Sequence, residues 1–249
     1  MSRWAQACTA LALLLAAPAQ ADRQSGSPDY EACLKLVDTV PEDAFERALQ
    51  WQGHGGGFAA RHCAALALVA LRQYAEAADR LEHLAEDMAR AQDKTGIAVL
   101  GQAGNAWMMA GLLERAKFVF DAALKLAPGD VDLLIDRARA KGENGEFQSA
   151  VTDLDAALKR APHRDDALVY RAAAQRKLNR AAAAANDLAT VLARQPDHVE
   201  ALLERGAIRR AQGDVMGARA DWIRVLALAP DSPAAGTAQA FIEELEVKR

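Results

Sequence analysis

Two cysteines are the residues of this chain best placed for covalent chemistry. Cys33 and Cys63 are left once an N-terminal leader that contains Cys8 is removed. In an oxidising compartment such a pair forms a disulfide, which would close a loop of about 30 residues and stabilise the fold by roughly 3–4 kcal/mol in the chain-entropy model. The alternative is a redox-active thiol pair, but the C-x-x-C spacing that tunes one thiol against its neighbour is absent. We therefore expect a structural disulfide.

The residue pattern gives little support for metal binding or catalysis. A metal site built from His54, His62 and Cys63 would use adjacent residues on one helix, which point about 100° apart. The other histidines are scattered, and G-x-S-x-G, H-E-x-x-H and phosphate-loop motifs are absent. We expect a non-catalytic protein with no metal and no cofactor.

An arginine and an aspartate recur together three times along the chain. The arginines are Arg137, Arg171 and Arg205. The aspartates are Asp153, Asp187 and Asp221. Arginine beside aspartate is compatible with an active site, but occurrence in triplicate at a fixed interval is typical of a structural pairing. We predict three ion pairs, one within each of the last three repeated units of the chain, that fix how the two helices of the unit align.

The composition indicates the class of fold in which these residues lie. The chain has 249 residues, 51% of them hydrophobic and 5% aromatic, which favours a folded protein built of helices with many small side chains. The net charge of −4 lacks the Lys/Arg surplus that phosphate neutralisation needs, so we expect no nucleic-acid partner.

Residues 1–21 have the pattern of a secretory signal peptide. Arg3 precedes an apolar run centred on residues 11–15, and Ala19 and Ala21 form an A-x-A cleavage site. The apolar run is shorter than the 18 or more residues of a membrane span, so we expect no span after cleavage. The sequence predicts an exported protein, and the periplasm is the expected compartment.

Four prolines show an internal period of 34 residues. They are Pro128, Pro162, Pro196 and Pro230. Aligned on this period, the chain divides into the units 58–91, 97–130, 131–164, 165–198 and 199–232, with five extra residues after the first. A position that recurs in every unit of this alignment is here called a column. Small residues occupy the eighth and twentieth columns of every unit, where two helices approach closely. A turn column lies between them and holds Arg72, Gly111, Gly145, Asn179 and Gly213.

The period, the small columns and the proline at position 32 resemble the tetratricopeptide repeat family. The resemblance covers about 58–232 and implies an all-α fold, a right-handed superhelical solenoid of about five helix-turn-helix repeats. The eleventh column departs from the pattern, because its last three members, Lys141, Gln175 and Arg209, are polar.

The two ends flank the repeat array. Residues 22–57 contain two short helical patterns and a Gly-rich hinge, and we expect a degenerate N-terminal hairpin that Cys33 and Cys63 fasten to the first repeat. Residues 233–249 form a predicted capping helix, whose Phe241, Ile242 and Leu245 would cover the last repeat.

The resemblance also implies a binding groove on the concave face, lined by the first helix of each repeat. Ten polar or adaptable side chains are predicted to line this groove. They are Gln102, Asn105, Met109, Asp132, Asp136, Arg139, Asp166, Tyr170, Lys177 and Glu204. Such a surface could hold an extended peptide or a partner helix, with the charges setting its orientation. The alternative is that acids near helix starts and bases near helix ends complement the helix dipoles.

These patterns predict a non-catalytic scaffold or adaptor of the bacterial cell envelope that binds a protein or peptide partner. Three other functions are compatible with the sequence. One is a periplasmic chaperone-like assembly factor, such as those of cytochrome c maturation. Another is a thiol-redox participant, and the third is an accessory subunit of a catalytic complex.

Overall fold

The computed structural model describes residues 27–247, and all regular secondary structure in that range is α-helical. The predicted signal peptide, residues 1–21, lies outside the described residues. The described residues divide into two compact units, 27–71 and 72–247. None of the described helices is both long enough and apolar enough to span a bilayer.

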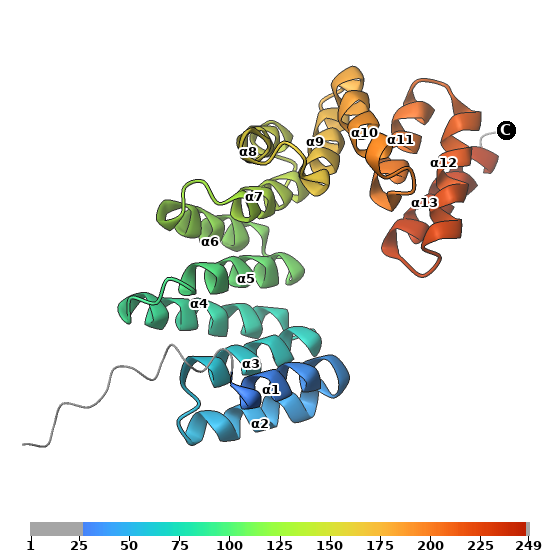
Figure 1. The fold of residues 1–249 in the computed structure, drawn as a ribbon. Helices are drawn as coiled ribbons and strands as arrows, with labels where there is room; N and C mark the ends of the chain where they lie inside the picture. Colours follow the sequence, from blue (N-terminus) through green and yellow to red (C-terminus); the bar gives the residue numbers. More distant parts are fainter. Residues whose placement is uncertain (1–26, 248–249) are drawn as a thin grey trace, which may run out of the picture. The chain divides into compact units, whose positions relative to one another are not determined.

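Thirteen helices make up the described part of the chain (Figure 1). Those of the first unit are α1 (Pro28–Thr39), α2 (Pro41–Gly53) and α3 (Gly57–Ala70). Those of the second unit are α4 (Tyr74–Arg90), α5 (Gly96–Met109), α6 (Leu113–Leu126), α7 (Val131–Glu143), α8 (Phe147–Arg160), α9 (Asp165–Lys177), α10 (Ala181–Arg194), α11 (Val199–Ala211), α12 (Val215–Leu228) and α13 (Pro233–Val247). The predicted first repeat, 58–91, spans α3 and α4 and so crosses the boundary between the units.

Both predicted helices of the N-terminal hairpin are present in the first unit. Pro28 and Pro41 occupy the first turns of α1 and α2, where a missing backbone N–H costs nothing. The Ser27 hydroxyl caps α1 by accepting a hydrogen bond from the Tyr30 amide (3.2 Å). The core of this unit consists mostly of small residues and cysteines, against which half-buried Tyr30 and Phe45 pack, and Leu68 is its one large apolar side chain that is fully buried among the described residues. This core offers little large apolar surface.

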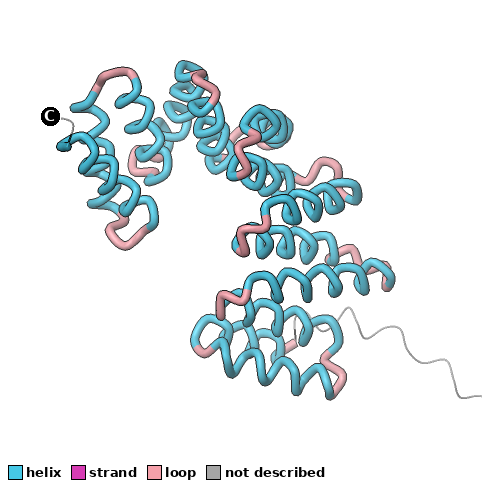
Figure 2. Tube along the Cα trace, turned by 180° about the vertical axis from the view of Figure 1, so that it is seen from behind, coloured by secondary structure: helices cyan, strands magenta, loops and turns pink. Residues whose placement is uncertain are grey.

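The predicted turn column determines where the first helix of each repeat ends. All five of its residues have φ between 60° and 86°, in the left-handed region. After Gly145, the Glu146 amide donates back to the Lys141 carbonyl (2.8 Å), which closes the helix end. In the last four repeats the second helix then ends two residues before the recurring proline, because a proline restricts the residue before it and cannot continue the helix. Figure 2 shows the short loops that result.

Small and large residues pair across each helical hairpin of the second unit. The Phe120 ring lies against Gly104, where an added Cβ would be only 2.5 Å from the ring. In the last repeat a Cβ at Gly206 would overlap the Trp222 indole, which is fully buried. The two intervening repeats have Ala opposite Leu at the same columns, and these residues are also buried. The eighth column therefore has a glycine where its partner on the second helix is aromatic, and an alanine where that partner is a leucine.

The three predicted ion pairs between helices of one repeat are confirmed. Arg137, Arg171 and Arg205 each donate two hydrogen bonds, of 2.6–2.9 Å, to the carboxylate 16 residues later. The three aspartates are 4–7% exposed. These bidentate pairs satisfy carboxylates that would otherwise be costly to bury. The hydrogen bonds also raise the pKa of all three guanidinium groups.

Two of these arginines also connect successive repeats. Arg137 Nη1 donates to Asp121 of α6, and Arg171 Nη1 donates to Asp155 of α8, both at 2.7 Å. The corresponding position before Arg205 is Ala189, which has no carboxylate. The last repeat thus lacks this link to its neighbour.

The helix α13 packs against α11 and α12 and covers the end of the second unit. The Phe241 and Trp222 rings lie 5.0 Å apart, and Ile242 is buried. Arg210 of α11 donates to Glu244 (2.7 Å). These contacts are those predicted for a capping helix.

Candidate functional site

Two pockets lie along the first helices of the repeats in the second unit. The first, here called the acidic pocket, has a volume of about 460 Å³ and lies between α5 and α7. Its polar lining consists of Lys94, Gln102, Asn105, Asp130, Asp132 and Asp136. Apolar contacts come from Ile97 and Leu133. Three carboxylates and one ammonium give this pocket a negative charge.

The second, here called the aromatic pocket, has a volume of about 260 Å³ and lies among α7, α8 and α9. Phe147, Leu154 and Tyr170 line it together with small residues such as Ala138 and Ala173. The charged lining residues are Arg139, Glu143, Arg176, Lys177 and Glu204. This pocket combines an apolar floor with a surplus of cations.

A short chain of contacts connects the two pockets through α7. Asn105 Nδ2 donates to Asp136 Oδ2 (2.8 Å), and Arg139 donates to the other carboxylate oxygen (3.2 Å). The Arg139 guanidinium lies 5.5 Å from the centre of the Tyr170 ring, a cation–π contact. Burial raises the pKa of Asp136, although the hydrogen bonds from Asn105 and Arg139 oppose it. The two pockets are therefore adjacent, and the ion pair between Asp136 and Arg139 lies between them.

Eight of the ten predicted groove residues line one of these pockets. Gln102, Asn105, Asp132 and Asp136 line the acidic pocket, and Arg139, Tyr170, Lys177 and Glu204 line the aromatic pocket.

The other two predicted residues lie outside both pockets. Met109 is 53% exposed at the end of α5. Asp166 pairs with Arg164 (2.7 Å), which also reaches Asp132 (2.7 Å) and so connects α7 to the start of α9. Burial raises the pKa of Asp166, but the hydrogen bonds from Arg164 and the Ala167 amide outweigh it, and the pKa is lowered.

Sequence reasoning missed the contribution of the second helices to the pockets. Phe147 and Leu154 belong to α8 and form part of the aromatic pocket, whereas the prediction took groove residues from first helices alone. Arg176 of α9 also lines the aromatic pocket, and its guanidinium pairs with Glu204 of α11 (2.8 Å). An apolar residue that opens a second helix, two residues after the turn glycine Gly145, is the signal that would have identified Phe147.

The polar eleventh column has a structural explanation. Lys141 and Arg209 donate to the buried carboxylates of Asp153 and Asp221, at 2.7 and 2.8 Å. Gln175 occupies the same column in the intervening repeat, and its side-chain oxygen is buried without a hydrogen-bond partner. Asp187 consequently receives ionic hydrogen bonds only from Arg171 among the described residues.

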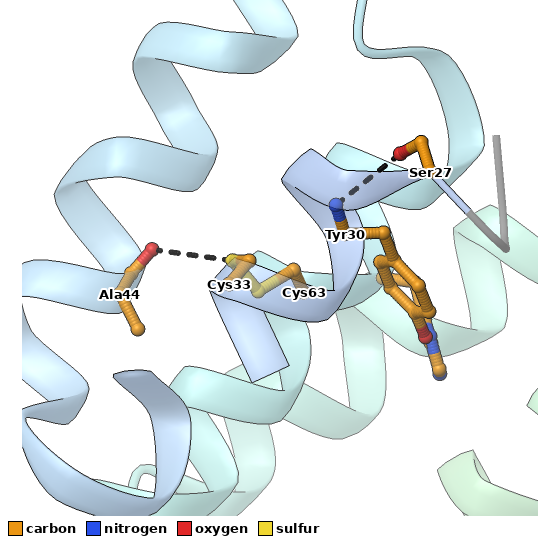
Figure 3. The surroundings of a disulfide bond; sticks show 6 residues. Ser27, Tyr30, Cys33, Ala44 and Cys63 are labelled. Atoms are coloured by element: carbon orange, nitrogen blue, oxygen red, sulfur yellow. Dashed lines mark hydrogen bonds between the residues drawn. A yellow bond between two sulfur atoms is a disulfide. The ribbon is translucent and has the colours of Figure 1, made fainter. Parts of the chain in front are cut away.

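Cys33 and Cys63 form a disulfide between α1 and α3 (Figure 3). Their Cα atoms are 6.3 Å apart, and both residues are buried. The Ala44 carbonyl oxygen lies 3.8 Å from Cys33 Sγ, and the Tyr30 hydroxyl is 2.5 Å from His62 Nδ1. Burial raises the pKa of Tyr30. A buried disulfide has little access to an attacking thiolate, which favours a structural role.

Metal ligands do not gather in the described range. Between residues 27 and 247, no group of three or more His, Cys, Asp or Glu side chains has the arrangement of a metal site. Cys63 is held in the disulfide, so it is not available as a thiolate ligand beside His54 and His62.

Comparison with known proteins identifies the repeats. The tetratricopeptide repeat family model matches residues 135–189 and 171–233. This chain is a tetratricopeptide repeat protein. No curated protein sequence matches it significantly.

Several solved structures share the fold. The C-terminal part of a repeat protein from Cytophaga hutchinsonii has a TM-score of 0.61 and 14% identity, over 81% of this chain and 79% of that one. YrrB, described as having an unusual peptide-binding site, has a TM-score of 0.54 and 18% identity, over 73% and 92%. MamA from Desulfovibrio magneticus has a TM-score of 0.53 and 16% identity, over 83% and 98%. At these identities the likeness concerns the fold alone.

Proposed function

We propose that this tetratricopeptide repeat protein is a non-catalytic scaffold that binds a peptide or helix of a partner protein across the acidic and aromatic pockets. The observation that carries the proposal is the pair of neighbouring pockets on the first helices of successive repeats. Both combine apolar walls with a few polar groups, which is the usual make-up of a recognition surface. Each pocket has the size to hold a side chain of the partner, and neither lining contains a nucleophile beside a base.

The family and its solved structures support this kind of binding. YrrB is itself described as a tetratricopeptide repeat protein with a peptide-binding site. Contacts between the pockets hold Asp136, Arg139 and Tyr170 in defined positions before any partner arrives, and such preorganisation lowers the entropic cost of binding.

We further propose that the protein works in the bacterial cell envelope. The leader-like pattern of residues 1–21 supports export, and a buried disulfide suits an oxidising compartment. Identification of the compartment requires fractionation of cells that express the full chain.

In-cell crosslinking and pull-down test the scaffold proposal. The double variant Tyr170→Ala/Asp136→Lys alters both pockets and should lose partners that the wild-type protein captures. The matched control is Phe118→Ala/Asp231→Lys, which makes the same types of change at exposed positions outside the pockets. Partners lost in both variants, or in neither, would contradict binding at the pockets. Circular dichroism checks that helicity is unchanged.

A further inference from the structure

The two pockets differ in charge, although they share α7. The acidic pocket has Asp130, Asp132 and Asp136 against a single Lys94. The aromatic pocket has Arg139, Arg176 and Lys177 against Glu143 and Glu204. A segment bound across both pockets would meet negative charge first and then, past the Asp136–Arg139 contact, an apolar cavity with positive charge.

Carboxylate oxygens in the acidic pocket have acceptor capacity left for a cation. Asp132 and Asp136 are four residues apart on α7, so their side chains lie on one face of the helix. Asp132 is 75% exposed and accepts from Arg164 through one oxygen. Asp136 accepts one hydrogen bond on each oxygen, and a carboxylate has about four acceptor sites in all. A Lys or Arg side chain of a partner could therefore bind both carboxylates.

The aromatic pocket suits a large apolar side chain that is next to a carboxylate. Small residues at 138, 142, 150, 173 and 174 leave space beside Phe147 and Tyr170. Arg176 is paired with Glu204, and Arg139 is shared between Asp136 and the Tyr170 ring. The Lys177 ammonium is exposed and has no acidic partner among the residues that the structure describes. A carboxylate on the partner would complement it.

The spacing of the helices sets the spacing of these side chains in the partner. One pocket lies between α5 and α7 and the other between α7 and α9, so they are separated by about one interhelix distance, roughly 8–10 Å. An extended peptide advances about 3.3 Å per residue. Roughly three residues of extended chain therefore connect the two pockets.

We infer that the partner segment carries a Lys or Arg for the acidic pocket and, about three residues away, a large apolar side chain next to an Asp or Glu for the aromatic pocket. This inference rests on the proposed function and adds the chemistry of the partner to it. The opposite charges of the two pockets fix the direction in which the segment lies.

Two successive measurements test the inference. Peptides about twelve residues long are first selected from a random library on the immobilised chain. The affinity of the enriched peptides is then measured by anisotropy titration. Enriched sequences should share a basic residue and an apolar–acidic pair about three positions apart. Asp136→Asn should weaken binding of such a peptide about tenfold, and the loss should vanish when its basic residue is replaced by norleucine. Lys177→Glu should also weaken binding about tenfold, and the loss should vanish when the acidic residue is replaced by its amide. The controls are Asp231→Asn and Lys159→Glu, exposed residues outside both pockets.

Three outcomes overturn the inference. They are enriched peptides without the charge pattern, no enrichment at all, and losses in the two variants that do not depend on the matching peptide residue. None of them decides the proposed function, because the pull-down with Tyr170→Ala/Asp136→Lys tests binding at the pockets whatever the partner's sequence.

Discussion

The two compact units hold their helices together by different means. In the first unit, α1 to α3 enclose a small core, and the Cys33–Cys63 disulfide joins its first and last helices. In the second unit, buried Arg–Asp pairs and complementary small and large residues recur from repeat to repeat. A short unit with little large apolar surface depends on a covalent bond, whereas a repeated array distributes the same task over many equivalent contacts.

Within the second unit, the repeats also differ from one another. Asp153 and Asp221 each have two cationic partners, but Asp187 has Arg171 alone among the described residues. Arg137 and Arg171 reach back to the preceding repeat, whereas Arg205 meets Ala189 at that position. A repeat can therefore lose one contact of the set and keep the fold, which makes each contact separately testable.

Arg171→Met should have the largest effect on stability. It leaves the buried Asp187 carboxylate without a cation, and loss of one partner of a buried pair costs about 3–5 kcal/mol. Arg137→Met should cost less, because Lys141 still contacts Asp153. Urea denaturation of the two variants gives the comparison. Equal losses would contradict the assigned role of the second cation.

Replacement of both cysteines by alanine should destabilise the first unit. We expect a loss of about 2–4 kcal/mol, because the unfolded chain would no longer be crosslinked. Hydrogen exchange followed by mass spectrometry should show faster exchange in residues 27–71 and unchanged protection in the repeats beyond α4. Free thiols in the purified wild-type protein would instead favour the redox alternative.

Gly206→Ala should destabilise the last repeat by about 1–3 kcal/mol, since its Cβ would overlap the Trp222 indole. Gly142→Ala in α7 is the matched control. No heavy atom lies within 4 Å of a Cβ placed there, and alanine is the better helix former by up to about 1 kcal/mol. Thermal melts of the two variants should move in opposite directions. Shifts of both melting temperatures in the same direction would contradict the conclusion that close packing against Trp222 requires glycine at position 206.

Ala189→Asp should have the smallest effect. It would give Arg205 the second carboxylate that Arg137 and Arg171 already have, and an exposed pair of this kind contributes about 0.2–1 kcal/mol. The stabilisation should disappear in the Arg205→Lys background, since lysine lacks the planar fork that reaches two carboxylates. A double-mutant cycle measures this coupling, and a coupling of zero would contradict the assigned geometry.

The sequence predicted the structure within each repeat better than the contacts between successive repeats. Periodic prolines, turn residues and small columns determined the helices, because each follows from backbone geometry or close helix approach and recurs every 34 residues. The pairing of Arg137 with Asp153 was predictable for the same reason. Its further contact with Asp121 was not, because that contact depends on how successive repeats pack. Phe147 was missed for a similar reason, since the second helices contribute to a pocket only through tertiary packing.

Site-specific photo-crosslinking tests the central claim most directly. A photoreactive amino acid would be placed in living cells at Gln102 in the acidic pocket and at Ala173 in the aromatic pocket, and for comparison at the exposed Lys125 and Lys159 outside both. The account predicts that a single partner protein is crosslinked from Gln102 and from Ala173, and not from the two lysine positions. Crosslinks to that partner only from Lys125 or Lys159 would contradict it and place the binding surface on the second helices of the repeats.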